Sequence, residues 1–140
     1  MDWGERRIGL AVSDPSGTIA TGIPTLHVRG REDALTQVAA AAADTEAVRI
    51  VVGLPLLLSG RRGEAAEAAE SFATALAQRT GLPVDTYDER LTSVMGQRRI
   101  HELGGRARGK AHIDQGAAVA LLESFLQRLA NARRDAGEDA

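Results

Sequence analysis

The chain has 140 residues, which suits a single domain with a substantial core. Its net charge of −2 argues against a general nucleic-acid coat protein, and the lack of cysteine excludes disulfides, thiolate catalysis and Cys-type zinc sites. No apolar stretch approaches the roughly 18 residues of a membrane span and no signal peptide precedes Asp2. We therefore expect a soluble, cytoplasmic protein with no membrane partner.

Residues 1–14 predict a short strand, a tight turn and a second strand. Gly4 permits the turn, and the apolar run at residues 8–12 fits a buried strand. Asp2 would then lie on a central strand, where a carboxylate is costly unless it is paired, hydrogen-bonded or bound to a metal. Only Met1 precedes Asp2, so we expect the native protein to begin a few residues upstream with an apolar segment.

The remaining pattern alternates between extended and helical segments. The pattern predicts an extended segment at residues 18–28, the last strand of a three-stranded antiparallel meander, and Pro24 favours an edge position for it. Next, the pattern predicts a helix at 31–45, a strand at 49–53, a helix at 64–80, a strand at 84–87, a helix from Thr92 or Ser93 to about 103, and a helix at 112–132. This order predicts an α/β fold, a mixed five-stranded sheet with helices on both faces. One domain would cover residues 1–132, with a disordered tail at 133–140.

Three acids stand where a plain surface acid is not expected. Asp2 lies on the first predicted strand, and Glu89 lies where the last strand ends. Asp114 heads the apolar stripe that the last helix should pack on the sheet, although a helix dipole alone would also favour an acid there. Strand alternation should point Asp88 and Glu89 to opposite faces.

Three converging carboxylates would repel one another, and a divalent cation resolves that conflict. The histidines His27, His101 and His112 show no metal-ligand spacing, so the ligands would be oxygens alone. Such a set favours Mg²⁺ or Mn²⁺, and two ions together would suit phosphodiester hydrolysis.

Arginine supplies nearly all the positive charge, in close pairs that flank glycines in predicted loops. The guanidinium fork suits phosphate, although such pairs also occur on ordinary solvated surfaces. The candidate nucleic-acid-binding residues are Arg7, Arg61, Arg62, Arg90, Arg106, Arg108 and Lys110.

Four motifs in order resemble one known family. They read Asp2-x-Gly4-x-x-Arg7-Ile8-Gly9-x-Ala11-x-Ser13-Asp14, Gly53-Leu54-Pro55, Asp88-Glu89-Arg90-Leu91-Thr92 and Ile113-Asp114-x-x-Ala117-Ala118. The chain thus resembles, to about Leu126, the YqgF family, also called RuvX, which comprises RNase H-like nucleases. Its members are described as pre-16S rRNA nucleases or Holliday-junction-resolvase-like proteins. Departures from the family are the absent strand before Asp2, Leu57 and Ser59 where Asn and Asp are usual, and a basic run before Ile113 reduced to Arg106, Arg108 and Lys110. Ala117 stands where the related RuvC-type resolvases carry a fourth acid.

The resemblance implies an RNase H-like endonuclease whose catalytic and metal-binding acids are Asp2, Glu89 and Asp114. Asp2 would bridge two Mg²⁺ or Mn²⁺ ions, and the other two acids would each hold one. Maturation of the 16S rRNA 5′ end is the first implied role, and cleavage of branched DNA is the second. The sequence leaves open whether the substrate is RNA or DNA and whether the metal is Mg²⁺ or Mn²⁺. It also leaves open whether the protein is a monomer or a homodimer.

Two other classes of protein remain to be distinguished. One is a nucleotide-binding module, because actin-like ATPases and sugar kinases share an Asp-x-Gly hairpin. Their architecture needs two such domains around a cleft, which 140 residues cannot supply. The other is a non-catalytic binder that takes part in ribosome assembly and retains the fold.

Overall fold

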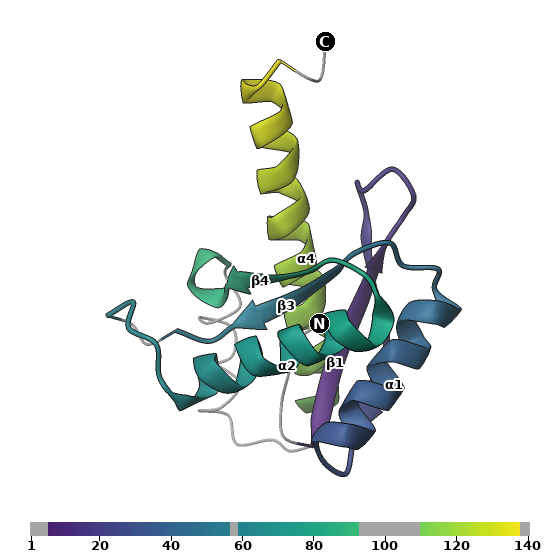
Figure 1. The fold of residues 1–140 in the computed structure, drawn as a ribbon. Helices are drawn as coiled ribbons and strands as arrows, with labels where there is room; N and C mark the ends of the chain where they lie inside the picture. Colours follow the sequence, from purple (N-terminus) through teal and green to yellow (C-terminus); the bar gives the residue numbers. More distant parts are fainter. Residues whose placement is uncertain (1–5, 57–58, 93–109, 138–140) are drawn as a thin grey trace.

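A computed structural model describes residues 6–56, 59–92 and 110–137, with the helical backbone only at 110–114. In chain order (Figure 1) the elements are β1 (Arg7–Ser13), β2 (Ala20–His27), α1 (Arg31–Asp44), β3 (Ile50–Leu54), α2 (Glu64–Thr80), β4 (Val84–Asp88), the 3₁₀ helix η1 (Glu89–Leu91) and α4 (Lys110–Asp135). The chain is therefore α/β, as predicted. Helix α2 has the predicted bounds, whereas α4 begins earlier than predicted and continues past residue 132.

The described strands form two separate two-stranded sheets, not the single five-stranded sheet that we predicted. Strand β1 pairs antiparallel with β2, with Ser13 opposite Ala20, and β3 pairs parallel with β4, with Leu54 opposite Asp88. The strand predicted around Asp2 lies outside the described residues, and no described strand joins β1 to β3. Side-chain packing, and not a shared hydrogen-bond ladder, therefore unites the two sheets within the described part.

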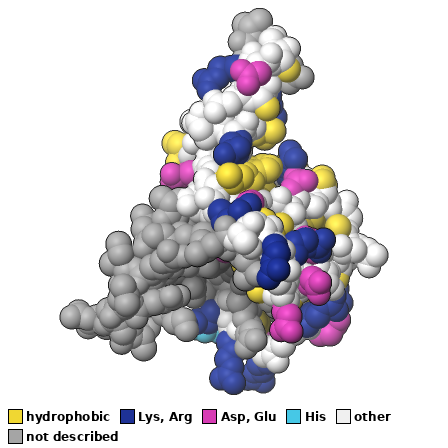
Figure 2. All heavy atoms as spheres, turned by 90° about the vertical axis from the view of Figure 1, so that its left-hand side faces the viewer, with side chains coloured by type: hydrophobic (Ala, Val, Ile, Leu, Met, Phe, Trp, Pro, Cys, Tyr) yellow, Lys and Arg dark blue, Asp and Glu magenta, His cyan; other side chains and the backbone are white. Residues whose placement is uncertain are grey.

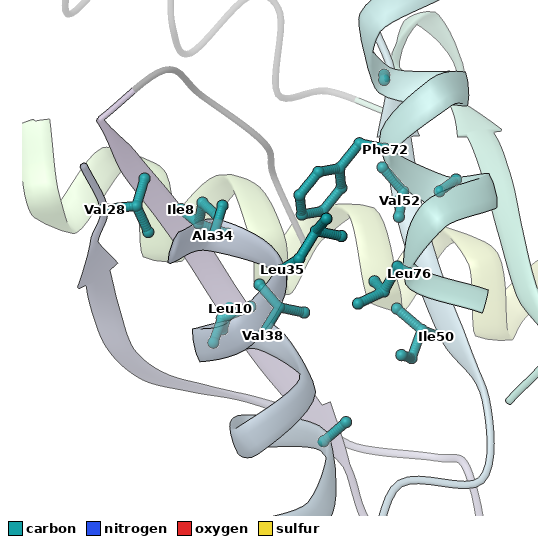
Figure 3. Packing of buried hydrophobic residues seen from close by; sticks show 13 residues of the cluster. Ile8, Leu10, Val28, Ala34, Leu35, Val38, Ile50, Val52, Phe72 and Leu76 are labelled. Atoms are coloured by element: carbon teal, nitrogen blue, oxygen red, sulfur yellow. The ribbon is translucent and has the colours of Figure 1, made fainter. Parts of the chain in front are cut away.

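One continuous core connects both sheets to α1 and α2. Figure 3 shows its apolar side chains pointing toward one another from β1, α1, β3 and α2. The largest fully buried members are Phe72, Ile8, Leu35, Leu76 and Val52. Burying an aliphatic or aromatic side chain of this size contributes about 1.5–3 kcal/mol. This core fixes β1 and β3 on the same side of the two helices.

Helix α4 covers the opposite side and contacts β1 and β2. Leu121 packs with Val51 and Tyr87 in a second, smaller core, where the rings of Tyr87 and Phe125 meet edge to face with centroids 5.8 Å apart. The predicted placement of helices on both faces is thus confirmed for the described elements, and the last turns of α4 project beyond the sheets (Figure 1). None of the described helices, α4 included, combines the length and the apolar character that crossing a membrane requires.

The segment that follows η1 is outside the described residues. It contains the helix predicted from Thr92 or Ser93 to about residue 103 and the glycine- and arginine-rich loop at 104–109. The first five residues are outside as well, so the expectations about Asp2 and an upstream apolar segment stay predictions.

Candidate active site

Glu89 lies at the carboxyl end of the parallel pair of strands. Strand β4 ends at Asp88, and Glu89 is the first residue of η1. At 8% exposure, Glu89 is the single buried charged residue in the described part of the chain. A carboxylate is rarely buried unless it is paired, hydrogen-bonded or coordinated. Because open α/β sheets bind ligands at the carboxyl ends of their strands, this position is the starting point for a candidate active site.

Gly53 makes room for the Glu89 side chain. A Cβ atom at position 53 would lie 2.7 Å from Oε1 of Glu89 and 2.8 Å from Cδ1 of Leu121. Both distances are shorter than any ordinary carbon contact, so a larger residue would displace the Glu89 carboxylate and the end of the Leu121 side chain. The Gly-Leu-Pro motif is therefore more than the end of a strand, because its glycine lets β3, η1 and α4 meet at one carboxylate.

Hydrogen bonds hold the turn that carries Glu89. The main-chain oxygen of Glu89 accepts from Oγ1 of Thr92 at 2.9 Å and from the Thr92 amide at 3.2 Å. Oγ of Ser124, on α4, donates to the oxygen of Leu91 at 3.3 Å and shares a hydrogen bond of 2.8 Å with the Tyr87 hydroxyl. The acid is thus fixed by its own turn and by α4.

Asp88 and Glu89, although adjacent, have different surroundings. Oδ1 of Asp88 accepts from the amide of Arg90 at 2.9 Å, and its Oδ2 accepts from Nη2 of Arg90 at 2.7 Å. The side-chain hydrogen bonds from Arg90 lower the pKa of Asp88 below its ordinary value, and Asp88 in turn raises the pKa of Arg90. Asp88 therefore has an arginine partner at the surface, whereas the Glu89 carboxyl is buried among strand and helix residues.

Arg90 also lies against the loop that connects β3 to α2. Gly60 has a φ of +87°, and a Cβ there would lie 3.1 Å from Nη1 of Arg90. Positive φ favours glycine, so this turn suits a residue without a side chain on both counts. The contact brings Arg90 next to the loop that carries Arg61 and Arg62.

The other candidate phosphate-binding residues are dispersed. Arg61 is exposed, Arg62 forms an ion pair with Glu70 at 2.5 Å, and Arg7 lies in the other sheet opposite His27. On the face drawn in Figure 2, basic side chains are interspersed with acidic ones over the described surface. Arg106, Arg108 and the side chain of Lys110 are outside the described part, so their role stays a prediction.

The described residues fit one part of the predicted metal centre. No three His, Cys, Asp or Glu side chains of the described part come together as a metal site. Asp2 and the side chain of Asp114 are outside that part, so the convergence of three acids stays a prediction. The backbone of α4 places Asp114 one helical turn before Ala118, which is fully buried. Glu89 itself offers the carboxylate oxygens that Mg²⁺ and Mn²⁺ prefer.

The sequence did not predict one contact near Asp114. Nε2 of Gln115 donates to the main-chain oxygen of Ile23 at 2.8 Å, and its side chain lies directly over Gly22. The available signal was Gly22 itself, because an isolated glycine inside a strand often marks a close approach by another segment.

Fold and site together define an α/β protein with an acid buried at the carboxyl end of a parallel strand pair. Over residues 1–128 the chain matches the family described as "RuvX: Holliday junction resolvase". It belongs to the RuvX family, and the resemblance drawn from the four motifs is confirmed.

Relatives agree with this assignment. A Chloroflexus aurantiacus protein named "Putative pre-16S rRNA nuclease" is 41% identical over 127 residues, 90% of this chain and 83% of the relative. A Mycobacterium bovis protein of the same name is 46% identical over 133 residues, covering 93% of this chain and 78% of the relative. Among solved structures, T. thermophilus RuvC in complex with a Holliday junction substrate has a TM-score of 0.47 and 13% identity, covering 90% of this chain and 97% of that one.

Proposed function

We propose that the chain is a divalent-metal-dependent endonuclease of RNase H-like fold, and that it hydrolyses phosphodiester bonds at the 5′ end of the 16S rRNA precursor. The observation that carries this proposal is the Glu89 carboxyl, buried against Gly53 at the carboxyl end of β3 and β4. Membership of the RuvX family and the names of the relatives support a nuclease acting on pre-16S rRNA. That substrate would place the protein in the cytoplasm, where ribosomes are assembled.

Asp2, Glu89 and Asp114 would hold the metal in this proposal. Two Mg²⁺ or Mn²⁺ ions, when bound, would supply an activated water and stabilise the leaving oxygen. Glu89 comes to this task already positioned, because its turn is fixed by Thr92 and its side chain is enclosed by Gly53 and α4.

The basic residues would bind backbone phosphates, which positions a nucleic acid without reading its sequence. Arg61 is exposed and close to the site through the contact between Gly60 and Arg90. Arg62 and Arg90 each have an acidic partner, so each would bind phosphate less strongly than an arginine that is not paired with an acid. Arg7, Arg106, Arg108 and Lys110 complete the proposed set.

Cleavage of branched DNA is the second candidate function, because the family description names a Holliday junction resolvase. One observation weighs against it. The position at which RuvC-type resolvases carry a fourth acid is Ala117, and its side chain is 4% exposed and packed in the interior. Any junction activity of this chain would therefore have to proceed with three acids.

The deciding experiment compares both substrates under one set of conditions. A pre-16S rRNA fragment and a four-way DNA junction are each incubated with the protein in Mn²⁺ and in Mg²⁺. We expect metal-dependent cleavage of the RNA near the mature 5′ end, lost in EDTA and in Glu89→Gln. Cleavage of the junction alone would favour the second candidate. Absence of cleavage with either ion, or undiminished cleavage by Glu89→Gln, would contradict the proposal, and tight ATP binding would favour a nucleotide-binding module instead.

A further inference from the structure

Gln115 joins the second turn of α4 to strand β2. Its Nε2 donates to the main-chain oxygen of Ile23 in β2 at 2.8 Å, and its side chain is half-buried. Gln127, on the same helix, provides a comparison. It is exposed, and its Nε2 donates to Oδ1 of Asn131 in its own helix at 3.0 Å. Gln115 thus makes a contact between segments far apart in the sequence, whereas Gln127 makes a local one.

Gly22 is shaped to accept this side chain. A Cβ at position 22 would lie 2.5 Å from Cγ of Gln115, 2.7 Å from its Cδ and 3.1 Å from its Nε2. Gly22 lies in the regular part of β2, opposite Ala11, and is not one of the glycines with positive φ. Space for Gln115, and not an unusual backbone conformation, therefore explains a glycine at this position.

Helix α4 has a second polar attachment, to the other sheet. Ser124 shares a hydrogen bond with Tyr87 of β4 and donates to the oxygen of Leu91 in η1. One attachment therefore fastens α4 to β2, and the other fastens it to the turn that carries Glu89. Because no described strand pairs β1 with β3, α4 is an element that fixes the two sheets relative to each other.

We propose that Gln115 is the positioning residue for the metal-binding acid Asp114. This inference rests on the proposed function, because the proposed function assigns Asp114 to the metal centre. By bonding to the Ile23 oxygen over Gly22, Gln115 fixes the rotation and height of the second turn of α4. That turn carries Asp114, so the contact sets the position of this acid relative to Glu89. Metal ligands need to be held to within about 0.5 Å, and the other polar attachment of α4, at Ser124, is more than two turns away from Asp114.

The first test uses Gln115→Met, which keeps the length of the side chain and removes its donor. We expect Mn²⁺ affinity, measured from the electron paramagnetic resonance signal of the free ion, to fall about tenfold, with a similar fall in kcat. The KM for the pre-16S rRNA fragment should stay unchanged, because Gln115 does not bind substrate in this account. Gln127→Met is the matched control and should leave Mn²⁺ affinity and kcat as in the wild type.

The second test asks whether Gly22 matters only because of Gln115. Gly22→Ala alone should lower Mn²⁺ affinity as much as Gln115→Met does. In a chain that already carries Gln115→Ala, the same glycine substitution should have no further effect, since the Gln115 atoms that lie nearest to residue 22 are then absent. If Gly22→Ala does not fold by itself, recovery of a folded chain in the double variant supports the same contact.

Two results would overturn the inference while leaving the proposed function intact. One is a wild-type protein that cleaves the RNA and a Gln115→Met variant with the same Mn²⁺ affinity and kcat. The other is a Gly22→Ala effect that is equal in both backgrounds. A wild-type protein that neither binds Mn²⁺ nor cleaves would contradict the proposed function itself, and this inference with it.

Discussion

The two sheets of this protein are built differently and contribute different things to the candidate site. Residues 50–53 of β3 are all buried, as in a parallel strand covered on both faces, and the carboxyl end of this sheet carries Glu89. The hairpin of β1 and β2 is half-exposed along β2. Near Asp114 it contributes the main-chain oxygen of Ile23, which accepts a hydrogen bond from Gln115. The doubly covered sheet therefore holds Glu89, whereas the hairpin contacts α4, the helix that carries Asp114.

The largest expected effect is a difference in cleavage rate between variants of two adjacent acids, Glu89 and Asp88. Glu89→Gln should reduce metal-dependent cleavage by more than about 100-fold, because it removes a proposed ligand without changing the shape of the side chain. Asp88→Asn is the matched control and should retain most of the activity, since Asp88 binds Arg90 at the surface. Single-turnover cleavage rates in saturating Mn²⁺ measure both. Equal losses in the two variants would mean that Glu89 has no special role.

The variant Gly53→Ala tests whether the site needs a residue without a side chain at position 53. Gly53→Ala should destabilise the fold by about 1–3 kcal/mol through overpacking and should slow cleavage by about 100-fold through displacement of Glu89. Gly116→Ala is the control. That glycine is exposed in α4 with nothing near its Cβ position, so alanine should stabilise the helix by about 0.5–1 kcal/mol. Urea unfolding and cleavage rates give both numbers, and a Gly53→Ala protein with wild-type activity would show that Glu89 tolerates the displacement.

The arginines beside the buried sheet should differ according to their partners. Arg61→Ala should reduce the slope of log binding constant against log salt by about 0.7–0.9, the value for one phosphate contact. Arg62→Ala should change that slope less, because Arg62 is already paired with Glu70. Filter binding of the RNA fragment at several KCl concentrations measures the slopes. A larger change for Arg62 than for Arg61 would show that nucleic acid displaces Glu70.

The smallest expected effect is the pH dependence of the Asp88–Arg90 pair. The folded-state pKa of Asp88 is lowered by its side-chain hydrogen bonds from Arg90, so the pair stabilises the fold above the ordinary Asp pKa. That contribution is lost as pH falls through the lowered value. Because Arg90 is 34% exposed, solvent screens the pair and its contribution to stability is small. The difference in unfolding free energy between wild type and Asp88→Asn should shrink from pH 7 to pH 3, and a constant difference would exclude the pair as its cause.

Local signals predicted the elements well. The apolar period of α2 and the glycine after it gave the bounds of this helix, and Gly81 indeed adopts a left-handed φ of 71° as its cap. The strand predicted at 84–87, running into Asp88 and Glu89, is β4, which ends at Asp88. These features depend on neighbours within a few residues, which a single sequence contains.

Contacts between distant segments could not be predicted in the same way. The sequence marked Gly53 and Gly22 as glycines in strands, but the side chains that fill their missing volume, Glu89 and Gln115, lie far along the chain. Likewise, an arginine in a basic motif does not reveal that Asp88 will bind it. The single five-stranded sheet was predicted from element order, which does not determine which strands pair.

In the proposed function, Glu89 binds a divalent metal ion at the end of β3 and β4. The most direct measurement is a crystal structure of the protein grown in Mn²⁺, with anomalous scattering recorded at a wavelength where Mn²⁺ contributes strongly. We expect an anomalous peak within about 2.0–2.3 Å of a Glu89 carboxylate oxygen, the distance typical of a small divalent ion bound to oxygen. A peak bound elsewhere, or an empty position beside Glu89 at saturating Mn²⁺, would contradict it.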